Sequence, residues 1–406
     1  KEEYLPRVTE VFIIIFVAGS VFSIAVTQTA LGFAFLSWSL FMILHRRSPL
    51  VRCRYDWFFV AFIVIGTLSV IFAVEKGIWM PFLKRVVLIP IVYLIAGAVS
   101  GRKMAGRLVF TLSAVMLLFS FIGIWKYLAS SGERLRLYNH YMTSGGILMI
   151  VALTTFAFTL VKAPVRIRLI ALAAGVVMVV PLVFTFTRSS WLGLLGGLAV
   201  MMLIQSRKML VVLVPAVVIL VLLAPAPVKE RALSSFDPGH SSNIERTYMW
   251  KAGIEMISDH PVTGVGDMDL SRLYGEYKSD EAQQVHGHLH NNMIMIGAIM
   301  GIPGLVLFLS MFGWIFISQI RTALNVAQSD WLLRGIALGS AGVMTGFQIN
   351  GLFEWNFGDS EIIMLLWISV GLSLAVERII SREAIVSGNG TTLQSGMPAG
   401  CPERNQ

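Results

Sequence analysis

Three histidines lie in a polar stretch that interrupts an otherwise apolar chain. The stretch, HGHLHNNMIMIGAIMGIPG, runs from His286 to Gly304, where a long polar loop meets a membrane-length apolar segment. Ionisable groups at such a depth are costly, and they therefore mark functional sites by default. A neutral imidazole is well suited to accept a proton from a hydroxyl. The sequence thus predicts a general base among His286, His288 and His290, with Asn291 beside it.

The spacing of His286 and His290 is also compatible with a zinc site. Zinc proteases of the H-E-x-x-H type place a glutamate after the first histidine, whereas Gly287 stands there in this chain and no third ligand is evident. We therefore predict no metal and no cofactor. On a helix, His286 and His290 would share a face and His288 would point elsewhere. Alternatively, these histidines satisfy the polar needs of an interface.

Two arginines are candidates for binding an anion. Arg188 stands between two such segments in TFTRSSWLGLLGG, and Arg246 falls in the first turns of a helix predicted within the long loop. The planar fork of a guanidinium suits phosphate oxygens. With Arg85 as a third candidate, these cations predict an anionic ligand presented from the bilayer, and a lipid pyrophosphate fits best. The alternatives are snorkelling for Arg85, snorkelling or pairing with a structural carboxylate for Arg188, and a solvated face or lipid-headgroup contacts for Arg134 and Arg136.

A further polar set follows the second-last apolar segment, in NGLFEWNFGDSE. Glu354 and Asn356 of this set are candidates for binding the hydroxyls of a substrate or for orienting the arginines. The alternative is an ordinary polar loop.

The composition indicates a membrane protein. Of 406 residues, 56% are hydrophobic and 14% are charged, against about 45–50% and about 25% in soluble domains. About 20 apolar residues cross a bilayer. We therefore predict an all-α polytopic membrane protein with about 12 transmembrane helices, in which the run 11–44 is split near Gln28. The predicted helices are centred on residues 10–25, 28–44, 57–73, 80–99, 108–128, 141–161, 169–187, 191–205, 209–224, 289–318, 335–352 and 361–377.

The distribution of basic residues predicts the topology. Lysines and arginines gather in alternate short connectors, which places both termini in the cytoplasm and the loop 225–286 on the other side. The net charge of +9 is spread over short loops without interleaved aromatic residues. This pattern argues against a groove for nucleic acid.

The chain divides into four predicted parts: a membrane domain at 1–224, a loop domain at 225–286, a second membrane part at 287–386 and a disordered cytoplasmic tail at 387–406. Within the loop domain, Ser242 and Glu245 match a capping box at the start of a helix. Trp250, Ile254 and Ile257 recur on one face of that helix. We expect this amphipathic helix to lie across the ends of the spans and to roof a cavity.

The motifs together resemble the O-antigen ligase and polymerase superfamily. His290-Asn291, nine residues, Gly301, two residues and Gly304 match the signature H-[NSQ]-x9-G-x-x-[GTY] of O-antigen ligases. The stretches IERTYMWKAGIEMISDHPVTGVG, TRSSW and FEWNFGDSE are also similar to recurring segments of that family.

The resemblance implies a GT-C-like, metal-independent and inverting glycosyltransferase of the bacterial inner membrane, with its active site facing the periplasm. It implies transfer of a glycan from an undecaprenyl pyrophosphate carrier to a hydroxyl of the lipid A-core oligosaccharide. In this scheme His290 is the general base, and Arg188 and Arg246 stabilise the departing pyrophosphate. The residues expected to bind substrate are Arg85, Asn291, His288, His286, Glu354 and Asn356.

Other functions remain open at this point. A polymerase of the same superfamily would use a second carrier-linked glycan as acceptor, and a protein O-glycan transferase would use serine or threonine. A polytopic lipid or sugar transporter is a different class. It would place its charges near the midplane of the membrane, in broken helices of two matched halves, whereas the polar residues here gather on one side.

Overall fold

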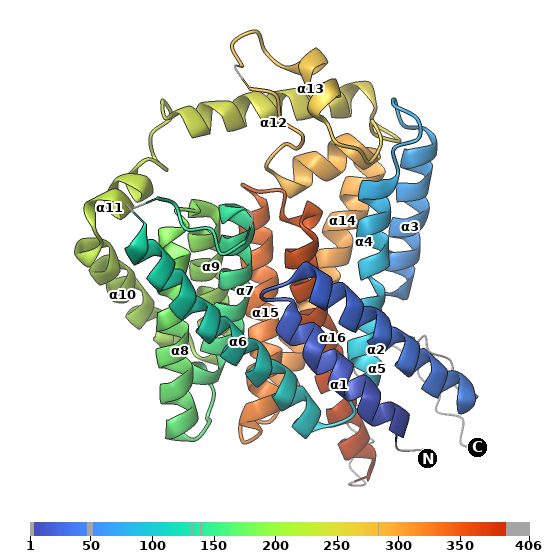
Figure 1. Cartoon of the computed structure of the whole chain (residues 1–406), viewed down its shortest axis with the longest axis vertical. Helices are drawn as coiled ribbons and strands as arrows, with labels where there is room; N and C mark the ends of the chain where they lie inside the picture. Colours follow the sequence, from blue (N-terminus) through green and yellow to red (C-terminus); the bar gives the residue numbers. More distant parts are fainter. Residues whose placement is uncertain (1–3, 47–51, 131–132, 139, 283, 387–406) are drawn as a thin grey trace.

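A computed structural model describes residues 4–46, 52–130, 133–138, 140–282 and 284–386, and these residues form helices and connecting loops (Figure 1). The helices that make up the bundle are α1 (Tyr4–Gly19), α2 (Ile24–Leu44), α3 (Asp56–Ile71), α4 (Met80–Leu88), α5 (Pro90–Ala98), α6 (Arg102–Ala129), α7 (Tyr141–Leu160), α8 (Val165–Phe184), α9 (Arg188–Gln205), η1 (Arg207–Met209), α10 (Leu210–Leu223), α14 (Asn292–Asn325), α15 (Trp331–Gly351) and α16 (Ser360–Val386). The helices outside it are α11 (Ala226–Leu233), α12 (Ser241–Asp259), α13 (Ser271–Tyr277) and η2 (Asn356–Gly358).

Length and composition confirm an all-helical polytopic membrane protein. In the described ranges, 9 helices are long and apolar enough to cross a membrane, with α4 and α5 counted together as Met80–Ala98. Three other predicted spans fall on α1, α3 and α10, which have 16, 16 and 14 residues. At 1.5 Å per residue, helices of this length reach about 21–24 Å, which is less than the hydrocarbon thickness of about 30 Å.

Two of the predicted helix boundaries were wrong. The break between the first two helices was expected near Gln28, but Gln28 lies inside α2. The break comes earlier because Ser23 caps α2, its side chain accepting a hydrogen bond from the backbone of Val26. The predicted helix 80–99 is divided at Pro90, which has no N–H to continue the helical hydrogen bonds of α4.

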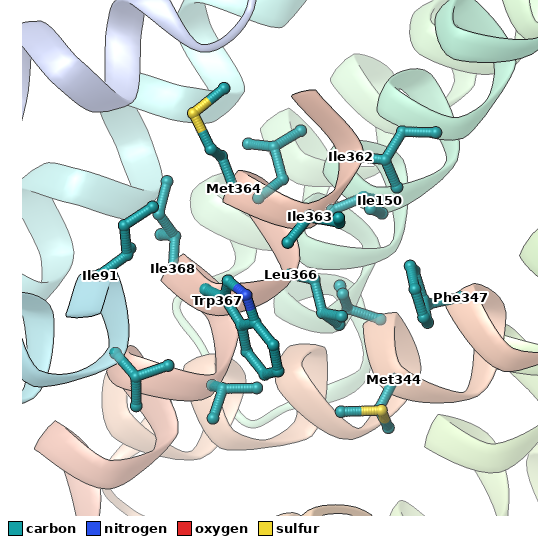
Figure 2. Close-up of a cluster of buried hydrophobic side chains, with 14 of the residues drawn as sticks. Ile91, Ile150, Met344, Phe347, Ile362, Ile363, Met364, Leu366, Trp367 and Ile368 are labelled. Atoms are coloured by element: carbon teal, nitrogen blue, oxygen red, sulfur yellow. The ribbon is translucent and has the colours of Figure 1, made fainter. Parts of the chain in front are cut away.

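The core is built around α16. In an apolar stretch of 18 residues of α16, 89% of the residues are buried inside the protein. The corresponding shares are 78% in α15 and 72% in α7, but only 33% in each of α2, α6 and α8. Figure 2 shows α16 packed between α5, α7 and α15. The labelled side chains of this cluster are Ile91, Ile150, Met344, Phe347, Ile362, Ile363, Met364, Leu366, Trp367 and Ile368. The loop that precedes α16 is therefore anchored on the most buried helix of the bundle.

The helices α11, α12 and α13 lie at one end of the bundle, which we call the capped end (Figure 1). α12 crosses the ends of the bundle helices there, as predicted. Its buried residues are Met249, Ala252, Gly253 and Met256. A Cβ atom on Gly253 would lie 2.5 Å from Ile294 and 2.7 Å from Leu289. The glycine therefore lets α12 pack tightly against the start of α14.

The predicted orientation of α12 was wrong in detail. The expected inward face carried Trp250, Ile254 and Ile257, but Ile254 is 55% exposed and the other two are only partly buried. Small residues and methionines face the bundle instead, because close packing against α14 requires them. The larger apolar residues lie at the edges of the contact.

The predicted capping box was also wrong. α12 begins at Ser241, and the N-cap residue is His240, whose Nδ1 accepts a hydrogen bond from the backbone N–H of Ser242 at 3.3 Å. The side chains of Ser242 and Glu245 are therefore free for other partners, Arg188 and His286 respectively.

α14 is broken at Gly301, which has φ +69° and ψ −175°. This conformation is practically restricted to glycine. The loop after α12 closes over the break: Val265 N donates to Ala298 O and Ile302 N donates to Pro261 O, each at 2.8 Å. The sequence predicted a kink near Pro303, and the break occurs two residues earlier. It fixes the first part of α14 to the end of α12.

The predicted tail 387–406 lies outside the described residues. The division into domains at 224/225 and 286/287 remains a prediction, although α10 ends at Leu223 and α11 begins at Ala226.

Candidate functional site

The three histidines lie in the loop that precedes α14, because α14 begins at Asn292, slightly later than the predicted start near residue 289. The loop still brings the rings together. The ring of His290 lies 4.3 Å from that of His288 and 6.2 Å from that of His286, centroid to centroid. His290 itself has φ +46°, a left-handed conformation that residues other than glycine adopt rarely and often at functional positions.

Glu354 joins His290 to Arg246. Its Oε2 lies 2.8 Å from Nδ1 of His290, and its Oε1 accepts a hydrogen bond from Nη2 of Arg246 at 3.0 Å. The three side chains are 7%, 13% and 17% exposed for Glu354, His290 and Arg246. Because a carboxylate only accepts, Nδ1 carries the proton and Nε2 is left with its lone pair. The sequence had named all three residues, and the structure brings them into one hydrogen-bonded chain.

The carboxylate of Glu354 is charged in this setting. Burial alone would raise its pKa, but the hydrogen bond from His290 and the positive charge of Arg246 outweigh burial and hold the pKa below its usual value. A charged Glu354 fixes the tautomer of His290 and favours the protonated imidazolium once a proton has been taken up.

The other two histidines have different partners. His286 Nε2 lies 3.4 Å from Oε2 of Glu245 in α12, so this residue connects the loop to α12. Burial, followed by the charge of His290, lowers the pKa of His288. His288 is therefore uncharged at neutral pH. Its ring packs in a T-shaped arrangement against the ring of His290.

Arg188 begins α9 and is 8% exposed. Its Nη1 donates to Ser234 Oγ at 3.0 Å, and its Nη2 donates to Ser242 Oγ at 2.9 Å and to Asn243 Oδ1 at 2.8 Å. All three acceptors are uncharged. Ser242 lies one turn before Arg246 on α12, so Arg188 contacts the turn of α12 that precedes Arg246.

Arg85 does not join these two arginines. It is 4% exposed, forms an ion pair with Asp267 and lies with its guanidinium carbon 5.2 Å from the ring centroid of Trp355. A buried arginine that is neutralised by a carboxylate is a structural group rather than an anion site. Arg85 therefore ties α4 to the loop domain and to the residue next to Glu354.

The two predicted asparagines make structural contacts. Asn291 caps α14 through its Oδ1, which accepts from Met293 N and Ile294 N, while its Nδ2 donates to Leu352 O. Asn356 is 2% exposed, and its Nδ2 donates to Phe347 O at 2.8 Å. Both amides thus hold the histidine loop and the Glu354 loop against the bundle.

A cavity of about 250 Å³ opens beside Glu354. It is smaller than the roughly 300–1,000 Å³ pockets of drug-sized ligands, so it suits a single small ring. Its lining combines an aromatic ring with polar groups. The lining residues include His140, Thr143, His288, Glu354, Trp355 and Asp359.

Two further arginines at the site were not identified from the sequence. Arg134 was expected on a solvated face, but it is partly buried and donates from Nε to Thr185 O at 3.2 Å and from Nη2 to Phe186 O at 3.1 Å. Arg231, on α11, donates from Nε to the same oxygen of Phe186 at 3.2 Å. The available signal for Arg231 was a basic residue at the end of a short helix that follows an apolar segment, which is too common to single it out.

Within the part of the chain that the structure describes, no group of three or more histidine, cysteine, aspartate or glutamate side chains is arranged to hold a metal ion.

The fold and the site define a polytopic helical membrane protein with a histidine–glutamate pair and several arginines gathered at its capped end. Residues 173–309 match the family model described as O-antigen ligase. This match over about a third of the chain supports the resemblance of its motifs to the O-antigen ligase superfamily, and it indicates a glycosyltransferase-like enzyme of the ligase or polymerase type. The match covers Arg188, Arg246 and His290 and ends before Glu354. A comparison with curated proteins gives no match.

Proposed function

We propose that the protein is an O-antigen ligase that transfers a glycan from undecaprenyl pyrophosphate to a sugar hydroxyl of lipid A-core. The reaction is metal-independent and inverting. The observation that carries this proposal is the hydrogen-bonded chain His290–Glu354–Arg246, in which an imidazole and a guanidinium flank one buried carboxylate next to a cavity. Membership of the family supports lipid-linked glycan and lipid acceptor substrates in general.

In the proposed reaction, Nε2 of His290 takes the proton of the acceptor hydroxyl. The acceptor oxygen then forms a bond to the anomeric carbon of the donor from the face opposite the leaving group, which inverts that centre. The bond between the anomeric carbon and the pyrophosphate oxygen breaks, and its electron pair leaves with the pyrophosphate. The imidazolium that forms is stabilised by the carboxylate of Glu354.

Arg188 and Arg246 act on the leaving group in this scheme. Arg188 binds only uncharged oxygens, so its charge is not neutralised by a partner. The buried Nε of Arg246 has no hydrogen-bond partner among the described residues. Fixed donors aimed at a place where negative charge develops are an effective form of catalysis in a site that excludes water.

The cavity beside Glu354 is the proposed binding place of the acceptor sugar. Trp355 offers an apolar ring face, and Thr143, His288 and Asp359 offer polar groups for hydroxyls. His288 is uncharged at neutral pH because burial lowers its pKa, so it can bind a hydroxyl without competing for the proton that goes to His290.

We further propose that the capped end faces the periplasm, with the helices in the bacterial inner membrane as a GT-C-like bundle. The basic residues of the connectors at the opposite end support this orientation. The lipid tail of the donor would then reach the site from the outer leaflet of that membrane.

The decisive experiment incubates the purified chain with a defined undecaprenyl-pyrophosphate glycan and a choice of acceptors, followed by mass analysis of the products. A ligase joins the glycan to lipid A-core. Joining two carrier-linked glycans instead would identify a polymerase, and modification of a serine or threonine peptide would identify a protein glycan transferase. Absence of any transfer, together with glycan movement across vesicle membranes, would replace the proposal with a transporter.

The matched variant is His290→Ala. We expect it to lose about 10²- to 10⁴-fold in rate, the usual contribution of a general base, while expression and the thermal unfolding temperature remain near those of the wild type. Wild-type turnover by His290→Ala would remove His290 as the base. EDTA should leave the rate unchanged, and inhibition that zinc reverses would contradict a metal-independent reaction.

A further inference from the structure

The carbonyl oxygen of Phe186 holds two guanidinium groups at once. Arg134 donates to it from Nη2 at 3.1 Å and Arg231 donates to it from Nε at 3.2 Å. These arginines come from separate parts of the chain, the loop before α7 and α11. A single uncharged acceptor does not neutralise either of them, so two like charges are gathered without a carboxylate between them.

The backbone of Phe186 adopts an unusual conformation at the point where its carbonyl oxygen accepts the two arginine hydrogen bonds. It has φ +52°, a conformation that bulky residues seldom adopt. The same short turn connects α8 to α9, so it also places Arg188 two residues later, at the start of α9. One turn therefore positions three arginines.

The three arginines are joined to Arg246 as one group. Ser234 accepts a hydrogen bond from Arg188 and itself donates to the carbonyl oxygen of Arg231 at 2.8 Å. The guanidinium of Arg188 lies within electrostatic range of Arg134, Arg231 and Arg246. Burial, followed by the charges of Arg134 and Arg246, lowers the pKa of Arg231. The like charges of these guanidinium groups therefore repel one another.

Bringing four cations together costs free energy unless an anion binds between them. The one carboxylate that contacts this group in the described residues is Glu354, through Arg246. Four guanidinium groups and one carboxylate leave a net charge of +3. A lipid diphosphate ester carries about one negative charge per phosphate, and the diphosphate released by transfer gains about one more.

We infer that Arg134 and Arg231 complete, with Arg188 and Arg246, a cradle that selects a diphosphate over a monophosphate lipid. This inference rests on the proposed function, since it concerns the donor and the product of that same reaction. Arg134 is also fixed from its other face by the ring of Tyr141, whose centroid lies 3.5 Å from the guanidinium carbon. In the described structure Arg231 donates through Nε, so its two terminal nitrogens are available to phosphate oxygens.

The test measures binding of undecaprenyl diphosphate and of undecaprenyl monophosphate to the full chain in lipid nanodiscs. Arg134→Gln and Arg231→Gln should each weaken binding of the diphosphate about tenfold, the size expected for lost hydrogen bonds to a charged group, and should weaken binding of the monophosphate much less. Arg136→Gln is the matched control, because Arg136 is exposed and only two residues from Arg134. It should leave both affinities unchanged.

The ratio of the two affinities separates binding from folding. A variant that merely loosens the Phe186 turn would weaken binding of both lipids equally, and that result would overturn the inference. Wild-type affinities in both variants would overturn it as well. Arg188→Gln reports on the proposed function independently. If Arg188→Gln weakens binding of both lipids while Arg134→Gln and Arg231→Gln weaken neither, Arg134 and Arg231 are not part of the binding site. The proposed donor site at Arg188 would then remain supported. If the wild type binds neither lipid, the proposed donor is itself wrong.

Discussion

The arginines at the two ends of the bundle have different kinds of partner. At the end opposite the capped end, Arg54 pairs with Glu377, Arg102 pairs with both Asp330 and Glu383, and Arg107 pairs with Glu10. At the capped end, hydroxyl, amide and carbonyl oxygens accept the hydrogen bonds of Arg134, Arg188 and Arg231. Both groups are well hydrogen-bonded, but only the first is neutralised.

Two arginines show that the role of an arginine depends on the chemical nature of its acceptors more than on the end of the bundle where it lies. Arg85 lies towards the capped end yet is paired with Asp267, and it performs a structural role. Arg334 lies at the opposite end and donates to Ala323 O and Val326 O. Those carbonyls belong to the C-terminal end of α14, where the helix dipole supplies negative charge. Arg188, whose acceptors supply neither a carboxylate nor a helix C-terminus, is therefore a better candidate for binding an anion than Arg85 or Arg334.

Removing the partner of Arg85 should have the largest effect on stability. Asp267→Asn leaves a buried, unpaired guanidinium, and breaking a buried pair in this way typically costs about 3–5 kcal/mol. We expect a markedly lower unfolding temperature and poor expression. The affinity of the surviving folded protein for undecaprenyl diphosphate should remain close to that of the wild type. A loss of affinity larger than the loss of folded protein would place Arg85 in the binding site.

Replacing an arginine by lysine separates the two ends. Arg188→Lys keeps the charge but loses the fork that meets several oxygens at once, and we expect about a tenfold fall in kcat/KM. Arg54→Lys at the opposite end is the matched control and should stay within about twofold, since it lies far from the site and its partner tolerates a point charge. Equal effects of both variants on kcat/KM would remove the distinction between the two ends.

The sequence predicted the placement of most apolar helices because each one records its burial in lipid as a continuous apolar run, although 9 of the described helices, rather than about 12, are long and apolar enough to cross a membrane. Arg188 and His290 are candidates from the sequence because charged or ionisable groups beside such runs are conspicuous, and Arg246 is one because it falls in the helix predicted within the long loop; the roles of all three remain predictions. The boundaries near Gln28 and Pro90 were less visible, since caps and breaks depend on one or two residues. The family match over 173–309 confirms the resemblance but not the roles of these residues.

What the sequence did not reveal depends on tertiary contacts. The spacing of the histidines fits a helix, but the chain at His290 takes a left-handed conformation to reach Glu354. Arg134 looked like a solvated residue because the carbonyl of Phe186 that holds it comes from a distant turn. Arg231 carried no local pattern at all. Backbone acceptors leave no trace in residue types, and this explains why half of the arginine cluster was missed.

Glu354 differs from the other acceptors of the site because it is a carboxylate that two side chains share, His290 and Arg246. Its pKa is lowered in the folded protein from an ordinary value of 4.5. Its contribution to stability is therefore complete above pH 4.5 and is lost as the pH falls below 4.5 through the lowered value. The unfolding temperature of the wild type should exceed that of Glu354→Gln near neutral pH, and the difference should shrink on acidification below 4.5. A difference that grows in acid would mean that Glu354 is protonated in the folded protein.

The smallest effect is expected from the paired arginines at the opposite end. Arg102 is 44% exposed, and exposed ion pairs contribute about 0–1 kcal/mol. Arg102→Gln should therefore change the unfolding temperature only slightly and leave the affinity for undecaprenyl diphosphate unchanged. The pair is also screened by salt, so the small difference in unfolding temperature should disappear when the ionic strength is raised. An effect of Arg102→Gln on lipid binding as large as that of Arg188→Gln would show that net charge, rather than the choice of partner, determines where the anion binds.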